Sequence, residues 1–163
     1  MKFFISKLYI WFDKGIKPRV ITFENNRVNV ITGSSSTGKS NIYAIIDYCL
    51  LSGRPNIVFP VINENARWYG LEFNVGDKFF AIARKRPTVD VVPPELYLQY
   101  DPFPEPFYPT SCNSHVNDAR RELDRAFGYK SNKELFYRSS FVFNALTENI
   151  ITSPYDFLNF KFY

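Results

Sequence analysis

The sequence predicts an α/β fold that carries an additional antiparallel β region. A short apolar run at residues 28–32 is followed by a polar loop that is flanked by glycines. The apolar residues that come next share one helical face: Ile42, Ile45, Ile46, Cys49 and Leu50. This order predicts a strand, a loop and a helix in succession. Between residues 67 and 84 apolar and polar side chains alternate around a turn at 75–78, which predicts a β-hairpin.

The composition indicates a globular protein with its own core. The chain has 163 residues, of which 45% are hydrophobic and 22% charged, and this excludes a disordered or fibrous chain. The net charge of +4 is a mild basic bias that suits a phosphate-bearing partner. No run approaches the roughly 18 apolar residues of a membrane span. The two cysteines, Cys49 and Cys112, have neither metal-ligand nor disulfide-framework spacing. We therefore expect a cytoplasmic protein without a membrane partner.

Four segments follow one another along the chain. Residues 1–55 hold three predicted strands (3–12, 20–23 and 28–32), the polar loop and the first helix. Residues 56–86 form the hairpin subdomain. Residues 87–112 form a connector without a regular strand, because seven prolines lie between Pro87 and Pro109. Residues 113–163 hold an amphipathic helix at 114–127 and then an incomplete β and loop region, whose alternating apolar residues 158, 160 and 162 lie where a chain end is normally polar.

The polar loop matches a phosphate-binding pattern. Gly33, Gly38, Lys39 and Ser40 occupy every fixed position of GxxxxGK[ST], and the chance of such a match in a chain of this length is under about 1%. Glycines let the backbone N–H groups wrap a phosphate, and the N-terminus of the following helix adds positive potential. We expect Lys39 to reach the β and γ phosphates of ATP, and Ser40 to offer its hydroxyl to Mg²⁺. The predicted nucleotide-binding residues are Gly33, Ser34, Ser35, Ser36, Thr37, Gly38, Lys39, Ser40 and Asn41.

The run LYIWF…RVITF…RVNVITGSSSTGKSNIYAIIDYCL resembles the opening of the SMC, RecF and SbcC group of ABC-class ATPases, in particular bacterial members with an SGTGKS loop and an IIDYCL helix. The pairs WYGLEF and FAIARKRP resemble the N-terminal β subdomain of the same group. The resemblance implies a P-loop NTPase fold, of which this chain is the N-terminal lobe of an ATPase head. It also implies a C-terminal ATPase lobe or a second head as partner, contact with DNA, and a role in DNA repair, chromosome maintenance or defence against foreign DNA.

The chain departs from this group in its loop and in its catalytic motifs. Many members have Asn and Gly where this loop has Ser35 and Ser36. The Gln loop, the signature, the Walker B strand and the switch histidine of the group are not found, so the catalytic residues stay unknown. The only glutamine, Gln99, lies in the proline-rich segment, and His115 lies at a helix start. We therefore expect hydrolysis to require a C-terminal lobe and the pairing of two heads.

Two further alternatives remain open from the sequence. The basic cluster Arg84, Lys85 and Arg86 is either a solvated strand end or a contact for nucleotide phosphate or the DNA backbone. The chain as a whole is either the ATP-binding part of an ATPase or a non-catalytic nucleotide-binding module that regulates a complete ATPase. A small P-loop kinase is a third interpretation, although neither an acceptor site nor lid arginines are identifiable.

Overall fold

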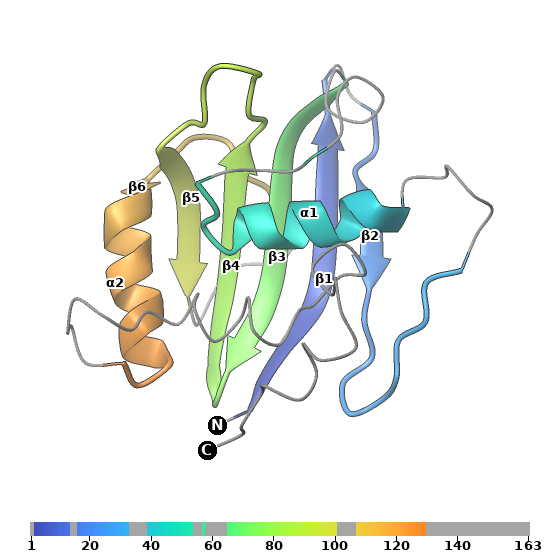
Figure 1. Cartoon of the computed structure of the whole chain (residues 1–163), viewed down its shortest axis with the longest axis vertical. Helices are drawn as coiled ribbons and strands as arrows, with labels where there is room; N and C mark the ends of the chain where they lie inside the picture. Colours follow the sequence, from blue (N-terminus) through green and yellow to red (C-terminus); the bar gives the residue numbers. More distant parts are fainter. Residues whose placement is uncertain are drawn as a thin grey trace, which may run out of the picture.

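One antiparallel sheet organises the chain in the computed structural model, which describes residues 2–13, 16–32, 39–53, 57, 65–100 and 107–129 (Figure 1). The elements in chain order are β1 (Phe3–Phe12), β2 (Arg19–Thr22), α1 (Lys39–Cys49), β3 (Ala66–Val75), β4 (Lys78–Lys85), β5 (Glu95–Tyr100), β6 (Ser114–His115) and α2 (Val116–Ala126). The spatial order of the strands is β2-β1-β3-β4-β5-β6, and each neighbouring pair is antiparallel. The predicted hairpin is confirmed as β3 and β4, joined at Gly76, whose φ of 60° suits a residue without a side chain.

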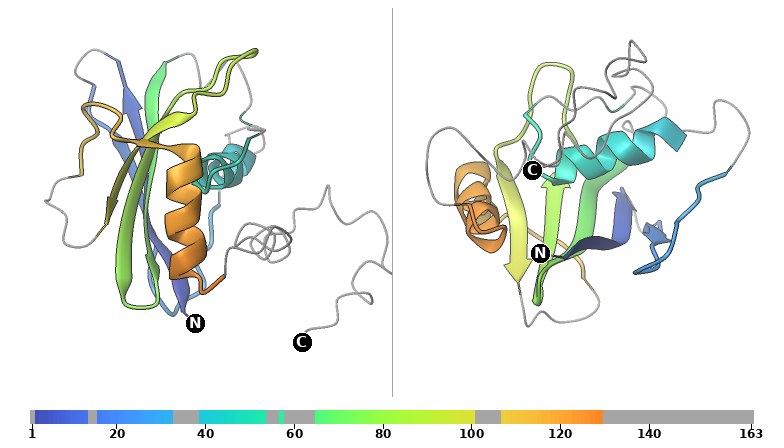
Figure 2. Two further views of the ribbon diagram at one scale, coloured as in Figure 1. Left: turned by 90° about the vertical axis from the view of Figure 1, so that its left-hand side faces the viewer. Right: turned by 60° about the horizontal axis from the view of Figure 1, so that its bottom comes forward.

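Both helices cover the same face of the sheet. α1 lies across the strands, and α2 runs beside β5 and β6 (Figures 1 and 2). Alternation along β3 sends Tyr69, Leu71 and Phe73 toward this face, and each of them is fully buried. They form one core with residues from β1, β4, β5 and both helices, including Ile45 and Leu123. Burial of this core therefore fixes the position of α1 on the sheet.

The opposite face carries a smaller aromatic cluster. Tyr9 and Trp11 stack at a centroid distance of 5.0 Å, and the ring of Phe107 meets both edge-on. Gly70 makes room for this arrangement, because a Cβ there would lie only 2.4 Å from Cζ3 of Trp11. The cluster therefore depends on a residue without a side chain in the middle of β3.

The predicted fold class, an α/β P-loop NTPase lobe with a separate β subdomain, is wrong. The described residues form a six-stranded antiparallel sheet with only two short helices. The predicted strand at 28–32 forms no strand, and Val28 and Val30 are 90% and 75% exposed. The pairs predicted as a subdomain are continuous with β1 and β5 in one sheet. An apolar, β-branched run favours extended backbone, but a strand also needs a neighbour with which to form hydrogen bonds.

The prediction that the proline-rich connector holds no strand is also wrong. Six consecutive residues between its prolines, Glu95–Tyr100, form β5 between β4 and β6. The helix predicted at 114–127 is confirmed as α2, which begins after His115 and ends before Gly128. The C-terminal β and loop region predicted beyond residue 129 lies outside the described residues. Within the described part of the chain, no helix is long and apolar enough to cross a bilayer.

The two cysteines give a chemical test of this packing. Burial raises the pKa of the Cys49 thiol to about 12, and this thiol, on the last residue of α1, is fully buried, whereas Cys112 is partly exposed. Iodoacetamide reacts with thiolates, so at pH 8 it is expected to modify Cys112 in the native protein and to spare Cys49 until the chain is unfolded. Mass spectrometry of the labelled protein would check this. Equal labelling of both cysteines in the native state would contradict the described position of α1.

Candidate functional site

The phosphate-binding motif ends where α1 begins. Lys39 and Ser40 are the first two residues of the helix, so the predicted opening of a helix at Lys39 is confirmed. The loop residues Gly33, Ser34, Ser35, Ser36, Thr37 and Gly38, and the side chains of Lys39 and Ser40, lie outside the described residues. The first turn of α1 contains no acidic side chain. The partial positive charge at the N-terminal end of a helix is therefore not offset by a carboxylate on this turn.

The first half of α1 rests on the sheet through a narrow apolar side. Asn41, the last residue of the predicted nucleotide-binding set, is 7% exposed, and Ala44 and Ile45 beyond it are buried. Ile42 and Ile46 are partly buried against the same core. The helical face predicted from the sequence is thus the face that contacts the sheet. The helix is fixed on a rigid support, which is what a site at its N-terminus requires.

The second half of α1 is held by a buried arginine. Arg84 of β4 is only 1% exposed, and its Nη1 donates hydrogen bonds to the carbonyl oxygens of Tyr48 and Ser52, each at 2.8 Å. Its Nη2 donates to the carbonyl oxygen of Pro93 at 3.1 Å. The guanidinium also lies 4.0 Å from the centre of the Tyr48 ring. The Arg84 guanidinium therefore links the end of α1, the segment that follows this helix and the segment that precedes β5.

Tyr48 completes this anchor from the helix side. Its hydroxyl donates a hydrogen bond to the carbonyl oxygen of Lys85 at 2.7 Å, and its ring meets Tyr69 edge-on at 6.2 Å. Burial raises the pKa of the Tyr48 phenol well above its ordinary value, although the Arg84 charge partly opposes this. The hydroxyl therefore stays protonated and remains a hydrogen-bond donor at neutral pH.

The structure divides the basic cluster that the sequence suggested as a phosphate or DNA contact. Arg84 points into the core under α1 and does not reach solvent, so it is not a surface contact for a phosphate. It binds the C-terminal end of α1, and Lys39 lies about 14 Å away along the helix axis. Lys85 and Arg86 are exposed, and Lys85 lies over the Trp68 ring at 5.8 Å. Within this cluster, only Lys85 and Arg86 therefore remain candidates for contact with an anionic partner.

Sequence reasoning missed the role of Arg84, although a signal was present. Arg84 follows Phe80 and Ile82 at every second position of β4, so it occupies the face of the strand that is otherwise apolar. A charged side chain at such a position has to be buried with partners or to break the sheet. Tyr48 gave no comparable signal, because its place on α1 is also typical of an ordinary core residue.

Exposed apolar side chains occur on β2 and on the segment that precedes the predicted phosphate-binding motif in the sequence. β2 pairs only with β1 among the described strands, and Val20 on β2 is 44% exposed. The segment 28–32 follows it, with Val28, Val30 and Ile31 exposed. Within this segment, the side chain of Asn29 closes the 24–29 turn through hydrogen bonds to the backbone of Glu24 and Arg27. We call the exposed residues Val20, Val28, Val30 and Ile31 the apolar edge.

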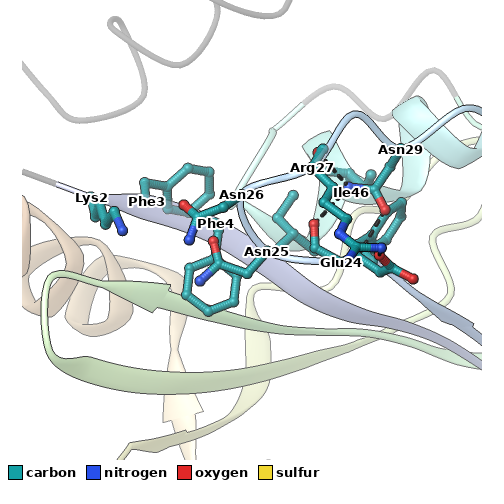
Figure 3. A pocket seen from close by; sticks show the side chains of 11 residues that line it. Lys2, Phe3, Phe4, Glu24, Asn25, Asn26, Arg27, Asn29 and Ile46 are labelled. Carbon is teal, nitrogen blue, oxygen red and sulfur yellow. Dashed lines mark hydrogen bonds and ion pairs between the residues drawn. The ribbon is translucent and has the colours of Figure 1, made fainter.

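Two pockets among the described residues do not belong to this site. The first, of about 340 Å³, lies between the start of β1, the 24–29 turn and Ile46 of α1 (Figure 3). Asn29 and Glu24 on its rim already form hydrogen bonds within that turn. The second, of about 430 Å³, lies between β5 and α2, and its Asp118 and Glu122 form ion pairs with Arg121 and Arg125. Neither includes a residue of the first turn of α1.

A buried carboxylate on the opposite face is satisfied by its own neighbours. Glu72 is 4% exposed, accepts a hydrogen bond from the Tyr9 hydroxyl at 2.7 Å and forms an ion pair with Lys7 at 3.3 Å. These partners explain its burial without a ligand. Within the described residues, no group of three or more His, Cys, Asp or Glu side chains is placed to hold a metal ion.

Comparisons with family models, curated proteins and solved structures return no match.

Proposed function

We propose that this chain binds ATP with Mg²⁺ through residues 33–41 and forms one part of a composite ATPase. The observation that carries the proposal is that a complete GSSSTGKS motif leads directly into α1, a helix held on the sheet by Arg84. The loop backbone and the helix N-terminus bind the phosphates, and Lys39 adds a positive charge at their β and γ positions. The donor set fits the ion as well, because Ser40 supplies a hydroxyl oxygen of the type that Mg²⁺ binds.

The apolar edge supports a partner beside the loop. Val28 and Val30 belong to the segment directly before Gly33 and are almost fully exposed. Exposed apolar side chains favour burial against another polypeptide. We propose that this polypeptide is a C-terminal ATPase lobe or a second head, and that it supplies the groups that orient water and complete the magnesium site. The resemblance to SMC, RecF and SbcC proteins supports a cytoplasmic role in DNA repair, chromosome maintenance or defence, with Lys85 and Arg86 as candidate DNA contacts.

Thermal unfolding with and without Mg-ATP tests the nucleotide site. At an ATP concentration of about one hundred times Kd, binding stabilises the native state by about 2.7 kcal/mol. For a chain of this size, this corresponds to a rise in Tm of roughly 5–10 °C. Lys39→Ala is expected to remove the rise, whereas Lys78→Ala, which removes a lysine at the start of β4, is expected to keep it. An equal rise in the wild type and in Lys39→Ala would show that the loop is not the binding site.

The same proteins separate binding from hydrolysis. We expect the purified chain to bind Mg-ATP and to turn it over no faster than Lys39→Ala, since the hydrolytic groups are supplied by the partner. Phosphate release in the steady state is the measurement. Turnover that depends on Lys39 in the chain alone would contradict its role as one part of a composite enzyme.

A further inference from the structure

We infer that Arg84 is a positioning residue for the nucleotide site: it fixes the C-terminal end of α1 and thereby sets where the N-terminal end of this helix presents the phosphate loop. The inference rests on the proposed function. Arg84 itself acts only through α1, because its guanidinium is buried at the end of the helix remote from Lys39.

The contacts of Arg84 restrain the helix more than packing alone does. Its Nη1 is shared by the carbonyl oxygens of Tyr48, within α1, and of Ser52, just beyond it. A third hydrogen bond, to the carbonyl oxygen of Pro93, ties the same guanidinium to the chain before β5. Hydrogen bonds are directional, whereas apolar contacts such as those of Ile45 allow a helix to roll or slide. Arg84 therefore defines an orientation that the hydrophobic contacts leave open.

The charge of Arg84 suits the end of the helix that it holds. The last carbonyl groups of a helix lack intrahelical partners and carry a partial negative charge. A guanidinium inside the protein is stable only when such acceptors surround it, and the Tyr48 ring adds a favourable face at 4.0 Å. An apolar side chain could fill the same volume, but it would remove the charged donor from these carbonyl groups, and the Tyr48 carbonyl would keep the Leu51 N–H at 3.1 Å.

A small tilt at the C-terminal end of α1 produces a larger displacement at its N-terminal end. α1 has 11 residues and is therefore about 16 Å long. A tilt of about 10° around its C-terminal end would move the first turn by about 3 Å, which is larger than the tolerance of a phosphate-binding loop. The loss of Arg84 is thus expected to weaken nucleotide binding even in molecules that remain folded.

Binding of mant-ATP with Mg²⁺, followed by fluorescence, tests this inference in the full chain. We expect Kd to rise at least about tenfold in Arg84→Met, because a misplaced helix end loses its alignment with the phosphates. A smaller rise is expected in Arg84→Lys, whose ammonium can still donate to the Tyr48 and Ser52 carbonyls. Lys78→Met removes a lysine from the other end of the same strand and is expected to leave Kd unchanged. All proteins are measured at a low temperature at which circular dichroism shows the native spectrum.

A merely structural role would give a different pattern. In that case Arg84→Lys and Arg84→Met would lower Tm, yet the folded protein would bind mant-ATP with the wild-type Kd, and this result would overturn the inference. If Arg84→Met does not fold, Arg84→Lys decides the question alone. Hydrogen exchange without nucleotide gives a second readout: amides 43–46, whose N–H groups take part in the hydrogen bonding of α1, are expected to exchange faster in the variants, whereas β3 amides keep their protection.

Binding of mant-ATP to the wild type distinguishes failure of the proposed function from failure of this inference. If the wild type shows no binding of mant-ATP that depends on Lys39, the nucleotide site itself is absent and the inference falls with it. If the wild type binds and the Arg84 variants bind equally well, only the positioning role is refuted.

Discussion

Gly70→Ala is expected to lower the free energy of unfolding by about 3 kcal/mol, the upper end of the usual cost of overpacking a core. The new Cβ would lie 2.4 Å from Cζ3 and 2.5 Å from Cη2 of Trp11, and 3.1 Å from Cε1 of Phe107. Trp11 cannot move away easily, because its ring is stacked on Tyr9 and bounded edge-on by Phe107. Either the ring or the backbone of β3 has to shift. Urea unfolding, followed by tryptophan fluorescence, measures the loss.

Gly53→Ala is the matched control for this substitution. A Cβ at Gly53 would meet no atom within 4 Å, and its backbone does not have the positive φ found at Gly76. Its free energy of unfolding is therefore expected to stay within about 0.5 kcal/mol of the wild type. Equal stabilities of the two variants would mean that Trp11 does not lie over Gly70, and the aromatic cluster on this face would have to be rearranged.

The sequence predicted those elements whose pattern is decided locally. Alternation of Tyr69, Leu71 and Phe73 with polar or small residues predicted β3, since successive side chains in a strand point to opposite faces. The apolar face of α1 and the glycine at the end of α2 were likewise visible in the sequence, because both depend on spacing within one helix. These elements are present in the structure close to their predicted bounds.

The elements that were predicted wrongly depend on neighbours that are distant in the chain. The run at 28–32 has the composition of a strand, yet among the described residues no strand pairs with it. Conversely, Glu95–Tyr100 sits among prolines that disfavour a strand, but β4 offers it a complementary edge, with Leu98 opposite Ile82. Composition sets the preference of a segment, whereas hydrogen-bond partners decide whether the segment becomes part of a sheet.

The same distinction between local and distant contacts applies to the candidate site. A phosphate-binding loop is a contiguous motif, so a sequence can propose its residues, and of these predictions the structure confirms the helix start at Lys39. The anchor at the other end of the helix brings together Tyr48, Arg84 and Pro93, and no local pattern links these positions. The sequence grouped Arg84 with Lys85 and Arg86 because they are adjacent. Alternation along β4 separates them, since it turns Arg84 toward the core and Lys85 to the opposite face.

Tyr48→Ala is expected to lower the free energy of unfolding by about 4 kcal/mol, within the range of large aromatic truncations in a core. Tyr48 is fully buried, packs edge-on against Tyr69 and lies against the guanidinium of Arg84. Removing the ring leaves a cavity between α1 and β3, and it takes away the aromatic face that stabilises a buried cation. Tyr48→Phe keeps the ring and removes only the hydrogen bond to the carbonyl oxygen of Lys85, so a smaller loss of about 1–2 kcal/mol is expected.

Urea unfolding of this pair, with Tyr108→Ala as control, separates the role of the ring from that of the hydroxyl. Tyr108 is 57% exposed, so its loss is expected to cost less than about 1 kcal/mol. Equal losses in Tyr48→Ala and Tyr48→Phe would place the whole contribution in the hydrogen bond, and they would contradict the packed interface between α1 and the sheet. In the proposed function the nucleotide site lies at the N-terminal end of α1, and Tyr48→Phe weakens the attachment of this helix less than Tyr48→Ala does, because the ring is retained. Tyr48→Phe is therefore expected to retain Mg-ATP binding, whereas Tyr48→Ala is expected to lose it together with the native position of the helix.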